Sequence, residues 1–469
     1  MPIVENLPQA IFYFEELKQE SPNVEKLYQA VLYLRRILSK NKNPPIQEVI
    51  KSGALANLVY LLLSTIPDIQ FEALWAITNI ASGTSDETQA VVDAGALPPM
   101  IRLLSSPHAH ICEQSVWALG NIIGDSAQLR ELVIKSGLIP TLFDIIKSDL
   151  PISFLRNIAW CISNICRNKN PMPDLNIVYM CMPYVSQFLH HSDKELIRDS
   201  CWALSYITDS QNDRIQLVIE AGLLNRLSLL LGHSDNSILV PALRTIGNIV
   251  TGTHQQTQAV INSTAMSMFP ALLKNKSKSI IKETAWTLSN IAAGNKDQIE
   301  QIFNMQLVQP MIDIMNKGSG FICQREAAWV IANIGISGHN EFLFKLIEMK
   351  ESLMPAISSF FTLNNDPKLV YALLQTTSFM LKASEGINKL EELLITIESC
   401  EGLDKLEQLQ SHPNKSVYEI SCQIIENYFG VEEEEDDLNQ ADKTEFCFDI
   451  PSTSYQIPSS NSTQPGFLF

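Results

Sequence analysis

Residues 71–84 read FEALWAITNIASGT, and segments like it recur along the chain at a nearly constant spacing. The segment carries Trp75 and, four residues later, Asn79, which a helix places on one face about one turn apart. The gaps between successive tryptophans are 42, 43, 42, 84 and 43 residues, and the tryptophans are Trp75, Trp117, Trp160, Trp202, Trp286 and Trp329. A period of about 42 residues is typical of helical solenoids of the armadillo and HEAT type.

Other positions repeat in step with the tryptophans. The middle of the double gap falls at Arg244, and four residues after each member of the series stand Asn79, Asn121, Asn164, Tyr206, Asn248, Asn290 and Asn333. Several units contain a small residue followed by a glycine, which is the signal of a left-handed helix C-cap, at Gly53, Gly95, Gly137 and Gly222. We expect a second helix after this turn, with Pro98, Pro140 and Pro270 near the start of such helices.

These patterns predict an all-α protein, a right-handed superhelical armadillo-repeat solenoid with about ten repeats of ~42 residues. The array is expected to fill residues 1–430, with the first repeat at about residues 5–45. Residues 431–469 begin with the acidic run EEEEDD at 432–437 and continue with many Ser, Pro, Asn and Gln residues. This composition predicts a disordered tail, because it offers too little apolar surface to pack.

Charge and motif content restrict the function. The 469 residues include 34 Lys and Arg against 51 Asp and Glu, so the formal net charge is −17. This imbalance argues against nonspecific nucleic-acid binding, which needs a basic face, and favours cationic partners. The histidines form no HExxH motif, and the glycines belong to helix caps rather than to a phosphate loop. We therefore expect no enzymatic activity, no metal and no cofactor.

Signals for the cellular compartment are mostly negative. The N-terminal residues lack the basic region of a signal peptide, and the most apolar stretch, from Leu55 to Ile66, is too short to cross a bilayer. The nine cysteines are an odd number and include no CxxC pair. Buried free thiols in a reducing compartment explain them best. The sequence thus predicts a soluble intracellular protein that does not insert into a membrane.

The phased tryptophans and asparagines, which we call the Trp–Asn ladder, have two interpretations. In the first, they only stabilise the array, with tryptophans filling grooves and amides bonding the neighbouring backbone. In the second, they form a ligand surface, because a recurring amide is costly to bury without a partner. The number of phased copies favours the second interpretation.

The spacing indicates an extended peptide as the ligand. Packed helices lie about 10 Å apart and an extended chain advances about 3.3 Å per residue, so each repeat would serve about three residues. Asparagine amides can pair with both polar groups of a peptide backbone, and tryptophan faces accept long aliphatic stems that end in a cation. The carboxylates Glu113, Asp125, Asp199 and Glu326 would then meet those cations. We therefore predict an extended Lys/Arg-rich ligand.

Arg244 interrupts the tryptophan series, and Tyr206 interrupts the asparagine series. An arginine at this place is expected to repel cationic side chains. Two separate basic clusters could then bind on either side of a neutral spacer. The alternative is a solvated arginine without consequence.

These residues resemble the importin-α (karyopherin-α) family, the adaptors that read nuclear localisation signals. The similarity runs from about residue 5 to Asp437 and rests on FEALWAITNIASGTSDET, EQSVWALGNIIGDS, CWALSYITDS, ALRTIGNIVTGT and EGLDKLEQLQSHPNKSVY. Within the family, the acidic tail and the CRNKNP segment look most similar to the importin-α1 subgroup. The resemblance implies a protein of the cytoplasm and nucleus that takes part in nuclear import.

The resemblance also implies two peptide-binding sites. A major site would comprise Trp75, Asn79, Gly83, Thr88, Glu113, Trp117, Asn121, Asp125, Asn157, Trp160, Asn164, Asp199 and Trp202. There the Gly83 carbonyl, the Thr88 hydroxyl and the Asp125 carboxylate would hold the key lysine. A minor site would comprise Arg244, Val250, Thr257, Trp286, Asn290, Glu326, Trp329 and Asn333.

Two departures from the family pattern affect the expected partners. Residues 1–45 already read as a repeat, so the family's basic importin-β-binding arm is expected to be absent, which makes importin-β binding doubtful and leaves the groove without self-inhibition. His254 stands where the family usually has an acidic residue, which should weaken the minor site. Basic cargo proteins remain the expected partners, and the export factor of the family is a further candidate through the C-terminal repeats. The alternatives are an armadillo scaffold for acidic partners and a regulator that sequesters cargo.

Overall fold

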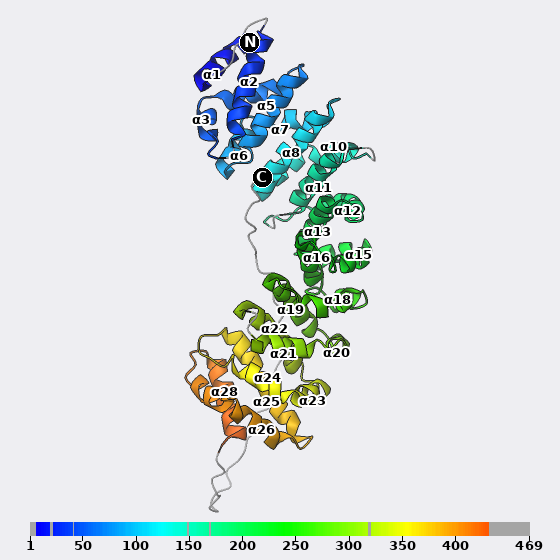
Figure 1. Ribbon diagram of the computed structural model, residues 1–469, viewed down its shortest axis with the longest axis vertical. Coiled ribbons are helices and arrows are strands. Elements are labelled where there is room, and N and C mark those ends of the chain that lie inside the picture. Colours follow the sequence, from blue (N-terminus) through cyan, green and yellow to red (C-terminus); the bar gives the residue numbers. More distant parts are fainter. Residues whose placement is uncertain are drawn as a thin grey trace, which may run out of the picture. The chain divides into compact units, whose positions relative to one another are not determined.

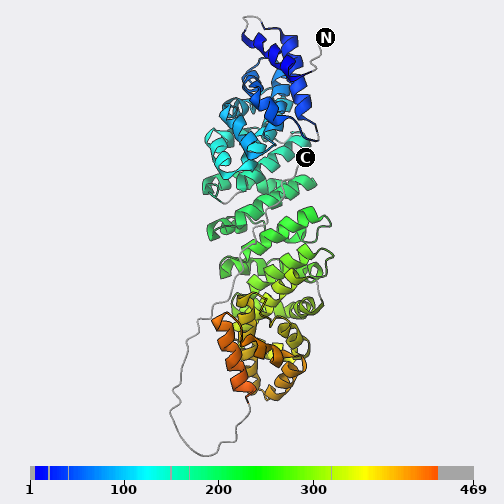
Figure 2. The same cartoon turned by 90° about the vertical axis from the view of Figure 1, so that its left-hand side faces the viewer.

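The computed structural model describes residues 6–18, 22–40, 42–147, 150–167, 170–317 and 320–430, and every element within these ranges is a helix. The predicted acidic tail at 431–469 lies outside the described residues. The chain divides into two compact units, Met1–Ser210 and Gln211–Phe469. Each unit is an α-solenoid in which short helices alternate with a long one (Figures 1 and 2).

In the first unit, the long helices α2, α5, α8, α11 and α13 follow one another side by side (Figure 1). The helices of this unit are α1 (Leu7–Phe14), the 3₁₀ helix η1 (Glu15–Lys18), α2 (Val24–Leu38), α3 (Ile46–Lys51), α4 (Ala54–Leu61), α5 (Pro67–Ile80), α6 (Ser85–Asp93), α7 (Leu97–Leu103), α8 (Ala109–Asp125), α9 (Ala127–Lys135), α10 (Leu138–Asp144), α11 (Ile152–Cys166), α12 (Leu175–Leu189) and α13 (Lys194–Thr208).

In the second unit, the corresponding long helices are α16, α19, α22, α25 and α28. The helices of this unit are α14 (Asn212–Glu220), α15 (Leu224–Leu230), α16 (Asn236–Ile249), α17 (His254–Ile261), α18 (Ala265–Leu272), α19 (Lys278–Ala292), α20 (Lys296–Asn304), α21 (Val308–Lys317), α22 (Phe321–Ile336), α23 (Asn340–Glu348), α24 (Lys350–Ser358), α25 (Pro367–Glu385), α26 (Leu390–Ser399), α27 (Gly402–Leu409) and α28 (Lys415–Tyr428).

The turn between the two short helices of a repeat depends on glycine, as the sequence predicts. Gly53 has φ +81° and Gly137 has φ +98°, a left-handed conformation that residues with a Cβ rarely adopt. Pro98 lies at the second position of α7, where its missing N–H is not needed. The expectation for Pro270 is wrong, because this proline lies inside α18 rather than near its start.

The first short helix of several repeats begins with a capping box. Thr253 and Gln256 exchange the two bonds of such a box at α17, and Asn295 and Gln298 do so at α20. The same glutamines also connect neighbouring repeats: Gln256 Nε2 donates to the Asn212 carbonyl at 2.8 Å, and Gln298 Nε2 donates to the His254 carbonyl at 2.8 Å. One side chain thus starts a helix and joins it to the preceding repeat.

Apolar side chains from all three helices of a repeat fill the core, which continues from repeat to repeat within each unit. The described cysteines are free thiols, and most are buried, as the sequence predicts. In the buried group at α11 and α12, a hydrogen bond with Cys166, together with burial, raises the pKa of Cys181 well above its usual range. No helix in the described part of the chain has both the length and the hydrophobicity that a membrane span requires.

Candidate functional site

The long helices of the first unit carry the N-terminal half of the Trp–Asn ladder. Trp117 on α8 is 37% exposed, and Trp75, Trp160 and Trp202 are half-buried. Trp160 lies so close to the preceding repeat that a Cβ added at Gly120 would stand 2.4 Å from its ring. The small residue at position 120 therefore lets α8 and α11 approach while the tryptophan edges stay accessible.

The asparagines of the first unit connect neighbouring repeats. Asn121 Nδ2 donates to the Thr78 carbonyl at 3.2 Å, and Asn164 Nδ2 donates to the Gly120 carbonyl at 3.1 Å. Asn79 Nδ2 donates to Ser39 Oγ at 2.9 Å, at the end of α2. The stabilising role that the sequence left as the alternative is therefore present, although Asn79 and Asn121 are also only half-buried.

Gly83, Thr88 and Asp125 come together where helices of two successive repeats end and begin. The Thr88 hydroxyl donates to the Ala81 carbonyl at 3.2 Å and to the Thr84 carbonyl at 3.1 Å, just after the C-terminus of α5. Asp125 is the last residue of α8, and its Oδ1 accepts from Ser85 Oγ at 2.8 Å. Helix C-terminal carbonyls, a hydroxyl and a carboxylate are groups that attract a cation.

The other predicted carboxylates of the first unit have partners within the chain. Glu113 Oε1 accepts from Asn157 Nδ2 at 3.2 Å, which joins two residues of the predicted major site. Asp199 is 5% exposed and pairs with the neighbouring Arg198, with the Nε–Oδ1 distance at 2.8 Å. Burial raises the pKa of Asp199 above its usual value, and the arginine opposes that shift. A ligand cation would therefore compete with Arg198 for Asp199.

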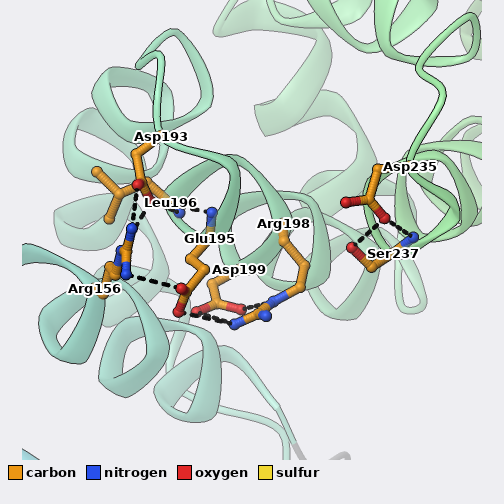
Figure 3. Close-up of polar contacts among 8 residues, drawn as sticks. All are labelled: Arg156, Asp193, Glu195, Leu196, Arg198, Asp199, Asp235 and Ser237. Atoms are coloured by element: carbon orange, nitrogen blue, oxygen red, sulfur yellow. Dashed lines mark hydrogen bonds and ion pairs between the residues drawn. The ribbon is translucent and has the colours of Figure 1, made fainter. Parts of the chain in front are cut away.

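An ion-pair network surrounds this position at the start of α13 (Figure 3). Arg156 on α11 pairs with Asp193 at 2.6 Å and with Glu195 at 2.9 Å. Glu195 also lies 3.9 Å from Arg198, so the network continues to Asp199. The bond from Arg156 lowers the pKa of Asp193, which also caps α13.

Tyr206 is the last residue of the Trp–Asn ladder in the first unit. Its ring stacks on Trp202 with a centroid distance of 5.8 Å and an interplanar angle of 26°. Burial raises the pKa of Tyr206. The tyrosine that replaces the asparagine of this repeat therefore packs against the tryptophan instead of presenting an amide.

The C-terminal half of the ladder, in the second unit, is closed. Trp286 and Trp329 are each 5% exposed, so little of either indole is accessible in this part of the structure. Asn333 Nδ2 donates to the Ser289 carbonyl of the preceding repeat at 2.9 Å, and Asn290 Nδ2 donates to the Trp286 carbonyl of its own helix at 3.0 Å. Both amides are buried and hold backbone rather than facing solvent.

Arg244 makes contacts within the chain that the sequence did not predict. Its guanidinium donates to both oxygens of Glu283, at 2.6 and 2.7 Å, and lies over the Trp286 ring at 5.7 Å. It is therefore not a freely solvated side chain. The attraction to a buried carboxylate and to an aromatic face accounts for its position.

The remaining minor-site residues form a partial copy of the first unit's junction. The Thr257 hydroxyl donates to the Val250 carbonyl at 3.3 Å, as Thr88 does to Ala81, and His254 is exposed beside them. Glu326 is 4% exposed and its Oε1 accepts from Arg325 at 2.9 Å, while Oε2 is buried without a hydrogen-bond partner. Burial raises the pKa of Glu326.

Sequence reasoning missed two arginines that pack between neighbouring repeats. Arg35 lies over the Trp75 ring at 4.7 Å and donates to Glu72 at 2.6 and 3.3 Å. Arg130 is fully buried between repeats. A partial signal for Arg35 existed, because a polar residue that could pair with it stands three positions before every ladder tryptophan. These residues are Glu72, Gln114, Asn157, Asp199, Glu283 and Glu326.

Comparisons with known proteins agree with this architecture. A profile described as "Armadillo/beta-catenin-like repeat" matches residues 42–82, 84–124, 126–167, 211–251 and 253–293, and one described as "Atypical Arm repeat" matches residues 391–443. A crystal structure of an engineered protein superposes with a TM-score of 0.77 at 22% identity, covering 91% of this chain and 100% of that one. The fold and the profiles define an armadillo-repeat protein.

Proteins of similar sequence show which armadillo-repeat proteins this chain resembles. Importin subunit alpha-3 of Caenorhabditis elegans is 50% identical over 181 residues, which are 39% of this chain and 35% of that protein. Importin subunit alpha-8 of Mus musculus is 50% identical over 173 residues, 37% of this chain and 35% of that protein. The chain is thus an armadillo-repeat protein that is similar to importin-α subunits, and the matched region spans about a third of the length of these relatives.

Proposed function

We propose that this protein is a nuclear-import adaptor that binds Lys/Arg-rich nuclear localisation signals in extended form, mainly on its first unit. The observation that carries the proposal is the row of accessible tryptophans from Trp75 to Trp202 beside the junction of Thr88 and Asp125. The similarity to importin-α subunits supports a role between cytoplasm and nucleus.

Cation recognition follows from the chemistry of the junction. A lysine ammonium at this place would meet the Gly83 carbonyl, the Thr88 oxygen and the Asp125 carboxylate, which together can accept its three donors. The end of α5 adds the partial negative charge of a helix C-terminus, a contribution of about 0.3–1 kcal/mol. At this junction Asp125 Oδ1 accepts from the neutral Ser85 hydroxyl, which leaves the charge of Asp125 available to a ligand.

The tryptophans would bind the aliphatic part of the ligand. The stem of a lysine or arginine can lie against an indole face, and each cation–π contact contributes about 0.5–2 kcal/mol according to its desolvation. Trp117, at 37% exposure, offers the largest free surface of the ladder. The second unit would contribute a weaker site, because its tryptophans must first be uncovered.

Titration of a fluorescently labelled Pro-Lys-Lys-Lys-Arg-Lys-Val peptide tests the proposal. We expect binding at micromolar protein or below, and a loss of at least about 100-fold in affinity for Asp125→Lys, because the substitution replaces an attraction with a repulsion in a partly desolvated site. Asp144→Lys, at the end of α10 outside the junction, is the matched control for the change of charge. Absence of binding, or equal effects of the two variants, would contradict the proposal.

An acidic peptide serves as the competitor in the same titration. A scaffold for acidic partners would bind it in preference to the basic peptide. We expect the basic peptide to win, because the carboxylates of the junction repel an acidic ligand. Import of labelled cargo in permeabilised cells then distinguishes a transport adaptor from a protein that only sequesters cargo.

A further inference from the structure

Two neighbouring long helices of the second unit begin in an unusually basic part of the chain. α19 and α22 pack side by side (Figure 1). Residues 274–282, from the turn before α19 into its first turns, contain four lysines and no acidic residue. Residues 314–325, from the end of α21 into α22, contain one lysine, one arginine and no acidic residue. These two stretches contrast with the formal net charge of −17 of the whole chain.

Three of these lysines face solvent on an ordered turn. Lys274, Lys276 and Lys278 are exposed. Asn275 Oδ1 accepts from the Ser277 N–H at 2.8 Å, and this bond fixes the turn that presents the lysines. A preformed surface loses less conformational entropy when a ligand binds than a flexible one does.

Lys278 connects this turn to the neighbouring repeat. Its carbonyl accepts from Cys323 Sγ at 3.3 Å, and its Nζ lies 3.6 Å from the place where a Cβ on Gly320 would stand. Burial raises the pKa of the Cys323 thiol, and the charges of Lys278 and Lys282 oppose this shift. Positive charge from the side of α19 therefore reaches the first turn of α22.

Two large apolar side chains lie exposed at the same place. Phe321 and Ile322, the first residues of α22, are each 56% exposed. They follow directly on Gly320, so the amino group of Lys278 and this apolar pair belong to one surface. We call this surface the lysine edge, and its residues are Lys274, Lys276, Lys278, Phe321 and Ile322.

The helix starts at the lysine edge differ from those of the other long helices of the second unit. Asp235, Asp366 and Asn414 cap α16, α25 and α28 with their side chains. Ser277 and Gly320 stand at the corresponding positions before α19 and α22 and give no side-chain cap. The partial positive charge of these two helix starts is therefore not offset by a carboxylate at the cap, and it adds to the charge of the lysines.

We infer that the lysine edge binds an acidic segment of a partner protein, one that carries an apolar side chain among its carboxylates. The exposed lysines complement the carboxylates, and Phe321 and Ile322 offer apolar contact. Nucleic acid fits this surface less well, since three lysines neutralise few phosphates and the chain as a whole is acidic. The inference concerns the second unit alone and does not depend on the peptide site proposed for the first.

Fluorescence anisotropy of the full chain with a labelled Asp-Glu-Asp-Leu-Phe-Asp-Glu-Asp peptide tests the inference. We expect saturable binding with a dissociation constant on the order of 10–100 μM at low salt. The affinity should fall at least about fivefold when the ionic strength rises to about 0.3 M, because salt screens exposed charges. Binding that does not saturate, or that does not respond to salt, would overturn the inference.

Reversal of charge tests whether the peptide binds at the lysine edge. The double variant Lys276→Glu, Lys278→Glu should bind the peptide at least about tenfold more weakly, because repulsion replaces attraction. The matched control is Lys382→Glu, Lys415→Glu, which changes the charge of the same unit equally at exposed positions of α25 and α28. It should stay within about threefold of wild type. Equal losses in the two double variants would contradict the inference.

Truncation of the apolar pair tests the second component of the surface. Phe321→Ser should weaken binding about fivefold and leave its salt dependence unchanged, since the lost contact is apolar. Ile395→Ser, at a 58% exposed position of α26, is the control and should bind as wild type does. Circular dichroism and thermal melting report whether each variant folds. If the lysine variant does not fold, Phe321→Ser decides, and binding equal to that of the control overturns the inference.

A single-stranded poly(U) oligonucleotide is the probe for the other class of polyanion. We expect it to bind more weakly than the acidic peptide under the same conditions, because it offers no apolar side chain to Phe321 and Ile322 and meets an acidic chain. Tighter binding of the oligonucleotide, lost in the Lys276→Glu, Lys278→Glu variant, would assign the lysine edge to nucleic acid and overturn the inference.

Discussion

Trp117 on α8 is 37% exposed, whereas Trp286 on α19 and Trp329 on α22 are each 5% exposed, although all three share one phase of the repeat. Over Trp286 lies Arg244, held by both oxygens of Glu283. The phase of a residue in the sequence fixes its place on the helix, but packing between repeats decides whether a ligand can reach it.

The largest effect expected from this difference concerns stability. Trp329→Ala should lower the free energy of unfolding by about 3–5 kcal/mol, because it empties a buried site, whereas Trp117→Ala should lower it by about 1 kcal/mol or less. Trp117→Ala should instead weaken peptide binding. Urea denaturation followed by circular dichroism measures the first effect. Equal losses of stability for the two variants would refute the contrast between the units.

Removing Arg244, which lies over Trp286, should lower the free energy of unfolding by a smaller amount. Arg244→Ala leaves Glu283, whose side chain is 4% exposed, with Lys282 at 2.8 Å as its remaining ion-pair partner. We expect a loss of about 2 kcal/mol, below the usual range for breaking a buried pair because Lys282 remains, and stronger quenching of tryptophan fluorescence by acrylamide. Arg325→Ala, which removes a half-exposed arginine, is the control. Unchanged quenching would show that Arg244 does not cover the indole.

Substitution of the asparagines sharpens the comparison further. Asn333→Ala removes a fully buried bond between repeats, although the Ser289 carbonyl keeps the Ala293 N–H, and should cost about 1.5 kcal/mol. Asn121 is only half-buried, so Asn121→Ala should cost about 1 kcal/mol, while it removes an amide from the proposed peptide site. Urea denaturation and the peptide titration give the two quantities. A larger stability loss for Asn121→Ala would reverse the assignment of roles.

The smallest expected effects are changes in stability with pH, and they have opposite signs at Asp193 in the first unit and at Glu326 in the second. Arg156 lowers the pKa of Asp193 from its ordinary 3.8, so Asp193 stabilises the folded state above that value, and this contribution is lost as the pH falls through the lowered pKa. The difference in stability between wild type and Asp193→Ala, about 1 kcal/mol at neutral pH from the lost cap, should therefore shrink in acid.

Glu326 should show the reverse. Burial raises the pKa of Glu326 above the ordinary 4.5, so the folded state binds this proton more tightly than the unfolded state does. The stability that the proton contributes is complete below pH 4.5 and is lost as the pH rises through the raised pKa. Glu326→Gln should match wild type in acid and be slightly more stable at neutral pH. Thermal melting of the variants at a series of pH values tests both signs, and parallel profiles for the two sites would contradict them.

The sequence predicts the repeat and most helix positions, because tryptophan phase, turn glycines and capping residues act within one repeat. It also places Thr88 and Asp125 in one site through the family resemblance. It does not predict Arg35 over Trp75, since the two are forty residues apart and a chain read in order shows Arg35 only as one more basic residue. The same applies to Arg130, whose role depends on carbonyls of the next repeat.

The difference in exposure between the two halves of the ladder also lies beyond sequence reasoning. The patterns around Trp117 and Trp286 are nearly the same, yet one indole is open and the other is covered. The covering pair, Arg244 and Glu283, could be found only by placing one repeat on the next. Local patterns therefore determine the elements, and contacts one period away determine the site.

The capping-box glutamines have a consequence for folding kinetics. Gln256 and Gln298 reach back to Asn212 and His254, a separation of 44 residues in each case, and the ladder amide of Asn333 does the same with Ser289. Because these contacts span one period wherever they occur, lengthening such an array adds contacts without lengthening the loops that must close. Relative contact order should thus fall as repeats are added, and a longer array should nucleate at more places without a slower closing step.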